Sequence, residues 1–218
     1  MSTHEGDMYV GHQFEDAEQQ LDSYSIGMWL FLVTEVLFFG GLFLAYIIYR
    51  TRYTQAFVAA HHELDWRLGG LNTVILITSS LTMALAVRAA VLNRMKAVLG
   101  WLGLTLLCAS GFMVVKYVEY SAKFEHHLFP GPKFEFQHAG VGSGQAQMFF
   151  NLYFAMTGLH GAHVLIGMIT MMVLAIRLWL MRKQRVDFIP IELTGLYWHF
   201  VDLVWIFLFP LFYLVGGN

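Results

Sequence analysis

Residues 25–50 read SIGMWLFLVTEVLFFGGLFLAYIIYR, which is the first of several long apolar runs in the chain. A helix rises about 1.5 Å per residue, so about 20 apolar residues cross the roughly 30 Å of hydrocarbon in a bilayer. Glu35 lies near the middle of this run, and no acidic or basic residue is closer to it than Asp22 or Arg50. A charge at that depth costs about 3 kcal/mol or more, which marks Glu35 as a candidate functional residue.

The composition of the chain predicts a membrane protein. Of its 218 residues, 57 % are hydrophobic, 16 % are aromatic and 13 % are charged, and the mean hydropathy is +0.56. We predict an all-α membrane protein with a polar tail at 1–24 and a single membrane domain at 25–218, because the apolar runs lack the alternation of a β-barrel. The five predicted transmembrane helices are at about 25–50, 69–92, 97–121, 147–178 and 192–215.

Several classes of protein are excluded. The formal net charge is −2 and no basic stripe is present, which argues against nucleic acid as a partner. Cys108 is the single cysteine, so neither an intrachain disulfide nor a site with two thiolates can form. No internal repeat supports a transporter built from inverted halves. A small excess of Lys and Arg in the second-to-third and fourth-to-fifth connections predicts a cytoplasmic N-terminus and a periplasmic C-terminus.

Lys116 and Glu119 are three residues apart near the end of the third predicted span, so they share one helical face. A local ion pair would lower the cost of placing both charges in the membrane, and this is the interpretation that we favour. A proton relay is the alternative. Asn72, in the second span, adds a polar group that we assign to tight packing between helices.

Histidines occur in the fourth and fifth spans. His160 and His163 share a face, where they could ligate haem or a metal if another helix supplied further ligands. We favour hydrogen bonds between helices for these two imidazoles, since small neighbouring residues allow close helix approach. The fifth span begins with Glu192, and His199 and Asp202 share a face within it. No nucleophile accompanies this His–Asp combination, so we predict a buried structural pair rather than a catalytic one.

Five segments, one on each predicted span, closely resemble subunit III of haem–copper cytochrome c oxidases. They occur in the order of that family, which makes the combination specific although each segment alone is weak. The chain is similar to the shorter bacterial type of this subunit, which lacks the first two helices of the mitochondrial type. The segments are Thr34–Gly40, Leu71–Thr73, Glu119–Tyr120, His160–Gly167 and Tyr197–Trp205.

The resemblance implies an accessory, non-redox subunit of an aerobic respiratory terminal oxidase in the bacterial inner membrane. Such a subunit contacts subunit I directly, assembles with subunit II, binds phospholipid and supports proton uptake, while the haem and copper lie in the partner subunits. The single cysteine agrees with this, because it cannot form the dinuclear copper site of subunit II. A larger respiratory supercomplex is a further partner that the resemblance leaves open.

The resemblance also implies roles for particular residues. Glu35 resembles a buried family carboxylate that reacts with carbodiimide, which requires a protonated acid. His163 and Arg177 resemble positions beside a phospholipid headgroup, so we expect these two residues and Glu35 to bind lipid. Lys116 stands where many relatives have Gln, and we expect neither a catalytic residue nor a metal ligand in the chain. Buried polar contacts between helices are expected at Asn72, Lys116, Glu119, His160, Glu192, His199 and Asp202.

Other functions remain open. Subunit III of a quinol oxidase has the same fold, and the electron donor is chosen by subunit II. An accessory protein of a nitric oxide reductase also has a similar fold. A different class is an independent five-helix metal or proton transporter, which would use Glu35, His160, His163, His199 and Asp202.

Overall fold

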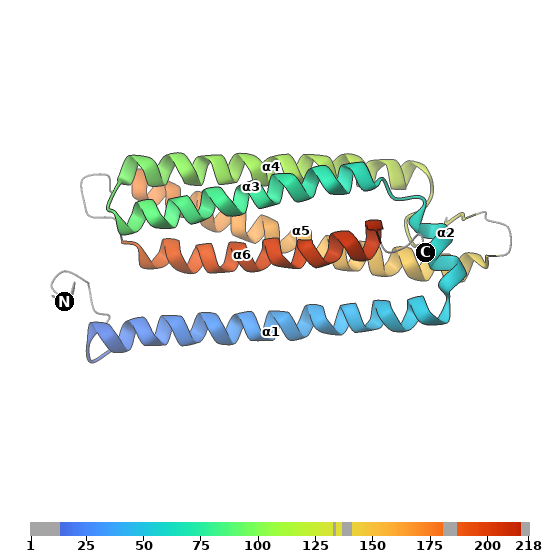
Figure 1. Ribbon diagram of the computed structural model, residues 1–218, viewed down its shortest axis with the longest axis horizontal. Coiled ribbons are helices and arrows are strands. Elements are labelled where there is room, and N and C mark those ends of the chain that lie inside the picture. Colours follow the sequence, from blue (N-terminus) through green and yellow to red (C-terminus); the bar gives the residue numbers. More distant parts are fainter. Residues whose placement is uncertain (1–13, 133, 137–140, 181–186, 215–218) are drawn as a thin grey trace. The chain divides into compact units, whose positions relative to one another are not determined.

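Residues 14–132, 134–136, 141–180 and 187–214 are described by the computed structural model of the chain. The elements among them are helices, and this part of the chain contains no strand. The chain divides into two units, Met1–Phe38 and Phe39–Asn218. The elements (Figure 1) are α1 (Ala17–Arg52), α2 (Thr54–His61), α3 (Trp66–Val91), α4 (Met95–Glu125), α5 (Ser143–Leu180), α6 (Ile189–Phe209) and the short π-helix η1 (Pro210–Leu214).

Five helices are long and apolar enough to cross a membrane. They correspond to the five predicted spans, so the predicted fold class is confirmed. The helices are longer than the apolar runs: α1 begins at Ala17 and α5 begins at Ser143. Hydropathy locates the part of a helix that lies in hydrocarbon, and a helix can continue into the polar boundary beyond it. The short helix α2 was not predicted.

Local capping explains where α1 begins in the N-terminal unit. The backbone N–H of Gln19 donates to Asp16 Oδ1 at 2.7 Å, and the backbone N–H of Glu15 donates to Gln19 Oε1 at 2.8 Å. These bonds work like a capping box, in which side chains satisfy the free N–H groups at a helix start. The helix therefore includes part of the predicted tail, whose residues 1–13 lie outside the described residues. Trp29 is exposed in this unit, as suits a surface in lipid.

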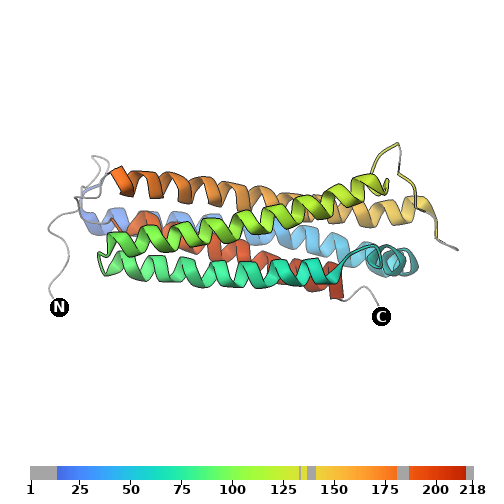
Figure 2. The ribbon, with the colours of Figure 1, turned by 90° about the horizontal axis from the view of Figure 1, so that it is seen from above.

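In the second unit, α3 and α4 pack side by side, and α6 packs against α3 and α5 (Figures 1 and 2). Asn93, with a φ of 53°, takes the left-handed conformation that ends α3, and the N–H of Arg94 bonds the carbonyl of Ala89 at 2.9 Å. This turn reverses the chain into α4. Gly167 allows α5 to approach α6 closely, because a Cβ at this position would lie 2.8 Å from the ring of Trp198.

Contacts from α1 and α2 hold the end of the chain at one end of this unit. Phe57 of α2 is buried, and its ring centroid lies 5.4 Å from that of Tyr46. The hydroxyl of Tyr46 donates to the carbonyl of Leu211 at 3.0 Å, and His61 Nδ1 bonds the carbonyl of Phe212 at 2.7 Å. The side chains thus satisfy carbonyl groups at a helix end and fix the position of η1.

Candidate functional site

A charged cluster lies on one face of α4, at Lys116, Glu119 and Lys123. Lys116 Nζ is 2.9 Å from Glu119 Oε2, and Lys123 Nζ is 3.8 Å from Glu119 Oε1. Spacings of three and four residues bring the side chains together on the helix. All three are buried, with side-chain exposures of 9 %, 2 % and 6 % in chain order. The predicted Lys116–Glu119 ion pair is confirmed, whereas the part played by Lys123 was not predicted.

Two tyrosines from other elements donate hydrogen bonds to Glu119. The hydroxyls of Tyr153 on α5 and Tyr213 on η1 lie 2.8 Å and 2.5 Å from Glu119 Oε1. Lys116 Nζ in turn donates to the hydroxyl of Tyr213 at 2.8 Å. Hydrogen bonds to an ionised partner are roughly twice as strong as neutral ones. The cluster therefore joins α4, α5 and η1 at one level of the bundle.

Aromatic rings surround the ammonium group of Lys116. Its Nζ lies 4.6 Å from the ring centroid of Trp205, 5.3 Å from Tyr213, 5.5 Å from Tyr153 and 6.0 Å from Tyr120. A ring within about 6 Å attracts a cation, and the attraction reaches about 2 kcal/mol in a desolvated site. These rings and the Glu119 carboxylate stabilise a cation in the interior. We interpret the cluster as a contact that joins helices.

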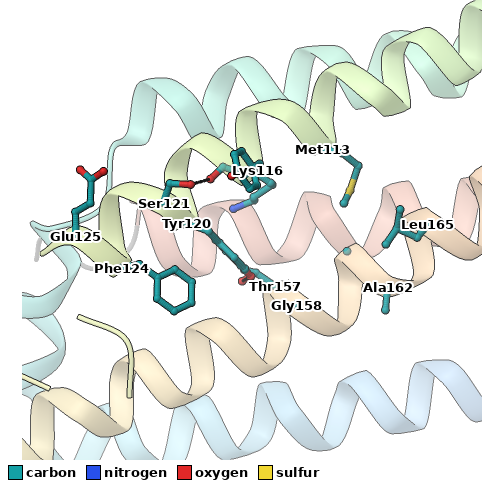
Figure 3. A pocket seen from close by; sticks show the side chains of 12 residues that line it. Met113, Lys116, Tyr120, Ser121, Phe124, Glu125, Thr157, Gly158, Ala162 and Leu165 are labelled. Carbon is teal, nitrogen blue, oxygen red and sulfur yellow. Dashed lines mark hydrogen bonds between the residues drawn. The ribbon is translucent and has the colours of Figure 1, made fainter. Parts of the chain in front are cut away.

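A groove of about 660 Å³ runs between α4 and α5 beside this cluster (Figure 3). Thr157 donates to the carbonyl of Tyr153 at 2.6 Å, so the 2.6 Å bond between Tyr120 and Thr157 is one that Tyr120 donates. The groove has mainly apolar walls. It is lined by Met113, Lys116, Tyr117, Tyr120, Ser121, Phe124, Glu125, Thr157, Gly158, Gly161, Ala162 and Leu165.

A second polar site lies between α3 and α6, where Ser80, His199 and Asp202 line a cavity of about 420 Å³. Ser80 Oγ and His199 Nδ1 are 2.7 Å apart. Asp202 is 4 % exposed, and neither carboxylate oxygen has a hydrogen-bond partner within the described part of the chain. The predicted His199–Asp202 pair does not form. The two residues share a helix face, but the imidazole bonds Ser80 on α3 instead.

The two histidines of α5 make different contacts. His160 is 1 % exposed, and its ring lies 5.5 Å from that of Phe112 and 5.3 Å from that of Trp205. Neither ring nitrogen of His160 has a hydrogen-bond partner among the described residues, so the predicted interhelical hydrogen bond of His160 is replaced by ring packing. His163 Nδ1 bonds the carbonyl of Leu159 in its own helix at 2.9 Å.

The remaining predicted residues lie apart from the charged cluster. Asn72 is fully buried on α3, and its amide has no hydrogen-bond partner among the described residues. Glu192 was expected to be buried but is exposed in the first turn of α6, where the partial positive charge of a helix N-terminus favours a carboxylate. Arg177 is exposed in the last turn of α5. Glu35 is partly exposed in the N-terminal unit.

Comparison with known proteins identifies the family. The sequence profile described as "Cytochrome c oxidase subunit III" matches residues 4–217. The chain belongs to this family. The cytochrome c oxidase subunit 3 of Synechocystis sp. is 35 % identical over 87 % of this chain and 74 % of its own length. The cytochrome bo(3) ubiquinol oxidase subunit 3 of Pseudomonas aeruginosa is 28 % identical over 95 % of this chain and 92 % of its own length.

A third relative differs in length. The "Heme-copper oxidase subunit I+III" of Aeropyrum pernix is 31 % identical over 89 % of this chain, which spans 23 % of that protein. The chain is thus a subunit III of the haem–copper oxidases, of the cytochrome c or quinol type, and part of an oxidase complex. Subunit III of these oxidases carries no redox cofactor itself. Within the described part of the chain, no group of three or more His, Cys, Asp and Glu side chains could hold a metal ion.

Sequence reasoning missed the residues of this subunit III that complete the charged cluster, namely Tyr153, Tyr213 and Lys123. For Tyr153, the sequence did contain a signal of burial. Tyr153 precedes His160 by seven residues, which is two helical turns, so both side chains lie on the buried face of α5. For Tyr213, the sequence contains no such signal. Its hydroxyl reaches Glu119 of α4 only because of the way in which η1 folds.

Proposed function

We propose that this chain is the accessory subunit III of a cytochrome c oxidase, in which it stabilises subunit I, binds phospholipid and supports proton uptake. One observation carries the contact with subunit I. In the Aeropyrum relative, a single protein is named as subunit I+III, and the region similar to this chain is 23 % of its length. A direct contact between subunits I and III in this oxidase explains why a relative can combine them in one polypeptide.

The buried cluster supports a scaffold role. Glu119 receives hydrogen bonds from α4, α5 and η1, so these elements keep one arrangement against which subunit I can pack. Electrons pass only through the haem and copper of the partner subunits I and II. The oxidase lies in a bacterial inner membrane, with the N-terminus of this chain in the cytoplasm and its C-terminus in the periplasm. An alkaline phosphatase fusion at the C-terminus should be active, and an inactive fusion would reverse this orientation.

Purification of the oxidase with and without this chain tests the function. We expect both preparations to show the same haem and copper spectrum, while the one that lacks the chain loses activity faster during turnover. Equal rates of inactivation would refute the stabilising role. If the purified chain alone bound one transition metal tightly through His160 and His163, the transporter interpretation would replace this proposal.

The electron donor separates two versions of the proposal. The relatives include both cytochrome c oxidase and quinol oxidase subunits, so the family alone does not choose between them. We propose cytochrome c, because the regions around Glu35 and Leu71–Thr73 resemble that branch. The purified complex should oxidise reduced cytochrome c faster than a quinol. The opposite ranking would assign it to the quinol oxidases.

Phospholipid binding is proposed at His163 and Arg177 in the second unit and, separately, at Glu35 in the N-terminal unit. Arg177 is exposed at the end of α5, where a guanidinium can pair with a phosphate. His163 precedes it by 14 residues, which is about 21 Å along a helix. A single headgroup cannot span that distance, so Arg177 binds the phosphate and His163 lies deeper, beside the acyl chains.

Lipid retained by the purified oxidase tests this site. Arg177→Ala should lower the amount of co-purified phospholipid. Arg88→Ala is the matched control, because Arg88 is also exposed in the last turn of a span, α3. An equal lipid content in both variants would remove Arg177 from the site.

A further inference from the structure

Lys116 is the one amine among the described residues that line the groove between α4 and α5 (Figure 3). Its side chain is 9 % exposed. It precedes Glu125, the last residue of α4, by nine residues, which is about 14 Å along the helix. Both helices cross the membrane, so the groove opens towards lipid or a partner subunit. A lysine that is removed from water in this way is a nucleophile that proteins use against carbonyl compounds.

The surroundings of the Lys116 nitrogen suit the product of such a reaction. An amine and an aldehyde condense to a protonated imine, which keeps one positive charge on the nitrogen. Glu119 Oε2 lies 2.9 Å from Lys116 Nζ, and the ring centroids of Trp205 and Tyr213 lie 4.6 Å and 5.3 Å away. The carboxylate and the ring faces attract a cation, whether it is an ammonium or an iminium. The site that stabilises the lysine therefore also stabilises the imine.

The hydrogen bonds of Lys116 tolerate the change. An ammonium has three protons, and among the described residues that of Lys116 donates to Glu119 Oε2 and to the Tyr213 hydroxyl. A protonated imine has one N–H, which can keep the bond to Glu119. Tyr213 then loses the bond that its oxygen accepts, but its own hydroxyl still donates to Glu119 Oε1. The contacts between α4 and η1 thus remain.

Glu119 can move the protons that the condensation requires. It takes one proton from the ammonium, and the neutral nitrogen then attacks the aldehyde carbon. The N–C bond forms while the carbonyl oxygen receives a second proton from the nitrogen and becomes a hydroxyl. Glu119 returns its proton to this hydroxyl, the C–O bond breaks, and water leaves. Ammonium and aldehyde give protonated imine and water, so the net charge is unchanged and no electron is gained or lost.

The groove selects a single long chain as the carrier of the aldehyde. Its walls are mainly apolar, its volume is about 660 Å³, and a Cβ added at Gly161 would meet nothing within 4 Å. The ester carbonyls of a phospholipid belong to the polar boundary of the bilayer, whereas Lys116 lies about 14 Å from the end of α4. An aldehyde at the end of one alkyl chain has no charged group, so it can reach this depth.

We propose that Lys116 is a covalent modification site, at which a long-chain fatty aldehyde enters the groove from the bilayer and forms a protonated imine with Nζ. Glu119 acts as the proton carrier and as the counterion of the product. The site is independent of the accessory role proposed above, so its failure would leave that role unchanged.

Reductive trapping tests the site. The whole oxidase complex in nanodiscs is incubated with hexadecanal and sodium cyanoborohydride, which reduces an imine to a stable secondary amine, and peptide mass spectrometry locates the modified lysines. Lys123 is the matched control, because it is also buried and its Nζ lies 3.8 Å from Glu119 Oε1, yet it does not line the groove. We expect the adduct at Lys116 and none at Lys123. Equal labelling of both lysines, or none at Lys116, would overturn the proposal.

Two comparisons test whether the aldehyde enters through the groove. Gly161→Leu fills the groove and should lose the adduct, whereas Gly103→Leu, at an exposed position of α4, should keep it. In the wild type, the short aldehyde acetaldehyde should label the exposed Lys96 and spare Lys116. An unchanged adduct in Gly161→Leu, or labelling of Lys116 by both aldehydes alike, would refute entry of a long chain through the groove.

Discussion

Replacing Glu119 with Gln should destabilise the subunit strongly, because the carboxylate compensates two buried lysines. Glu119 lies 2.9 Å from the Lys116 ammonium and 3.8 Å from that of Lys123. Gln has nearly the same shape but carries no charge, so both cations stay buried without their partner. Removing one member of a buried ion pair costs about 3–5 kcal/mol. Lys123 adds little to this loss, since its Nζ also bonds the carbonyl of Glu63 at 3.4 Å.

The measurement is the temperature at which subunit III unfolds and leaves the detergent-purified oxidase. For a chain of this size, 1 kcal/mol corresponds to about 2–4 °C, so Glu119→Gln should lower the transition by about 6–20 °C. Adding Lys116→Met should restore part of the loss, because it removes one unpaired cation. Glu135→Gln, at an exposed loop position, should change stability by less than about 0.5 kcal/mol.

Two results would refute this reasoning. A Glu119→Gln variant within about 1 kcal/mol of the wild type would mean that the carboxylate does not compensate the lysines, since a broken buried pair costs several times more. A second mutation Lys116→Met that lowers stability further would mean that the loss comes from packing around the rings and not from charge.

Three further predictions concern single positions. Gly167→Ala should cost about 1–3 kcal/mol in thermal unfolding of the complex, because its Cβ would lie 2.8 Å from Trp198, whereas Gly161→Ala, with open space around it, should be nearly neutral. Glu35→Gln should leave assembly and subunit I activity almost unchanged, since Gln keeps nearly the shape of the partly exposed Glu35 side chain; a severe loss of oxidase activity would show that a carboxyl group is needed there. Asp202→Leu should not lower the unfolding temperature, because it removes a buried carboxylate without described partners; a clear drop would reveal a partner in the complex.

The sequence predicted the fold well because lipid imposes a simple rule on composition. A span must be apolar over about 20 residues, and this pattern is visible without knowledge of packing. The same rule says little about where a helix ends. Residues 17–24 (AEQQLDSY) are mostly polar yet helical, since capping at Asp16 and Gln19 satisfies the backbone there. The helix α2 escaped prediction because its eight residues are too few to give a periodic signal.

The candidate site was predictable only where its contacts are local in sequence. The Lys116–Glu119 pair follows from a spacing of three residues on one helix. The same spacing failed for His199 and Asp202, because a shared face brings two side chains near each other without making them bond. Tyr213 lies 94 residues from Glu119, and its hydrogen bond depends on how η1 turns at the end of α6. Such contacts require the tertiary structure.

The position of Trp205 argues against proton transfer between two polar sites of the second unit. One is the charged cluster of α4, and the other is the Ser80–His199–Asp202 cavity. Trp205 contacts both sites, since its ring lies 4.6 Å from Lys116 Nζ and it also lines the cavity. Its indole N–H donates to Thr73 at 3.1 Å, and an indole has no acceptor with which to take up another proton. Among the described residues, Trp205 therefore separates the two polar sites instead of passing a proton from one to the other.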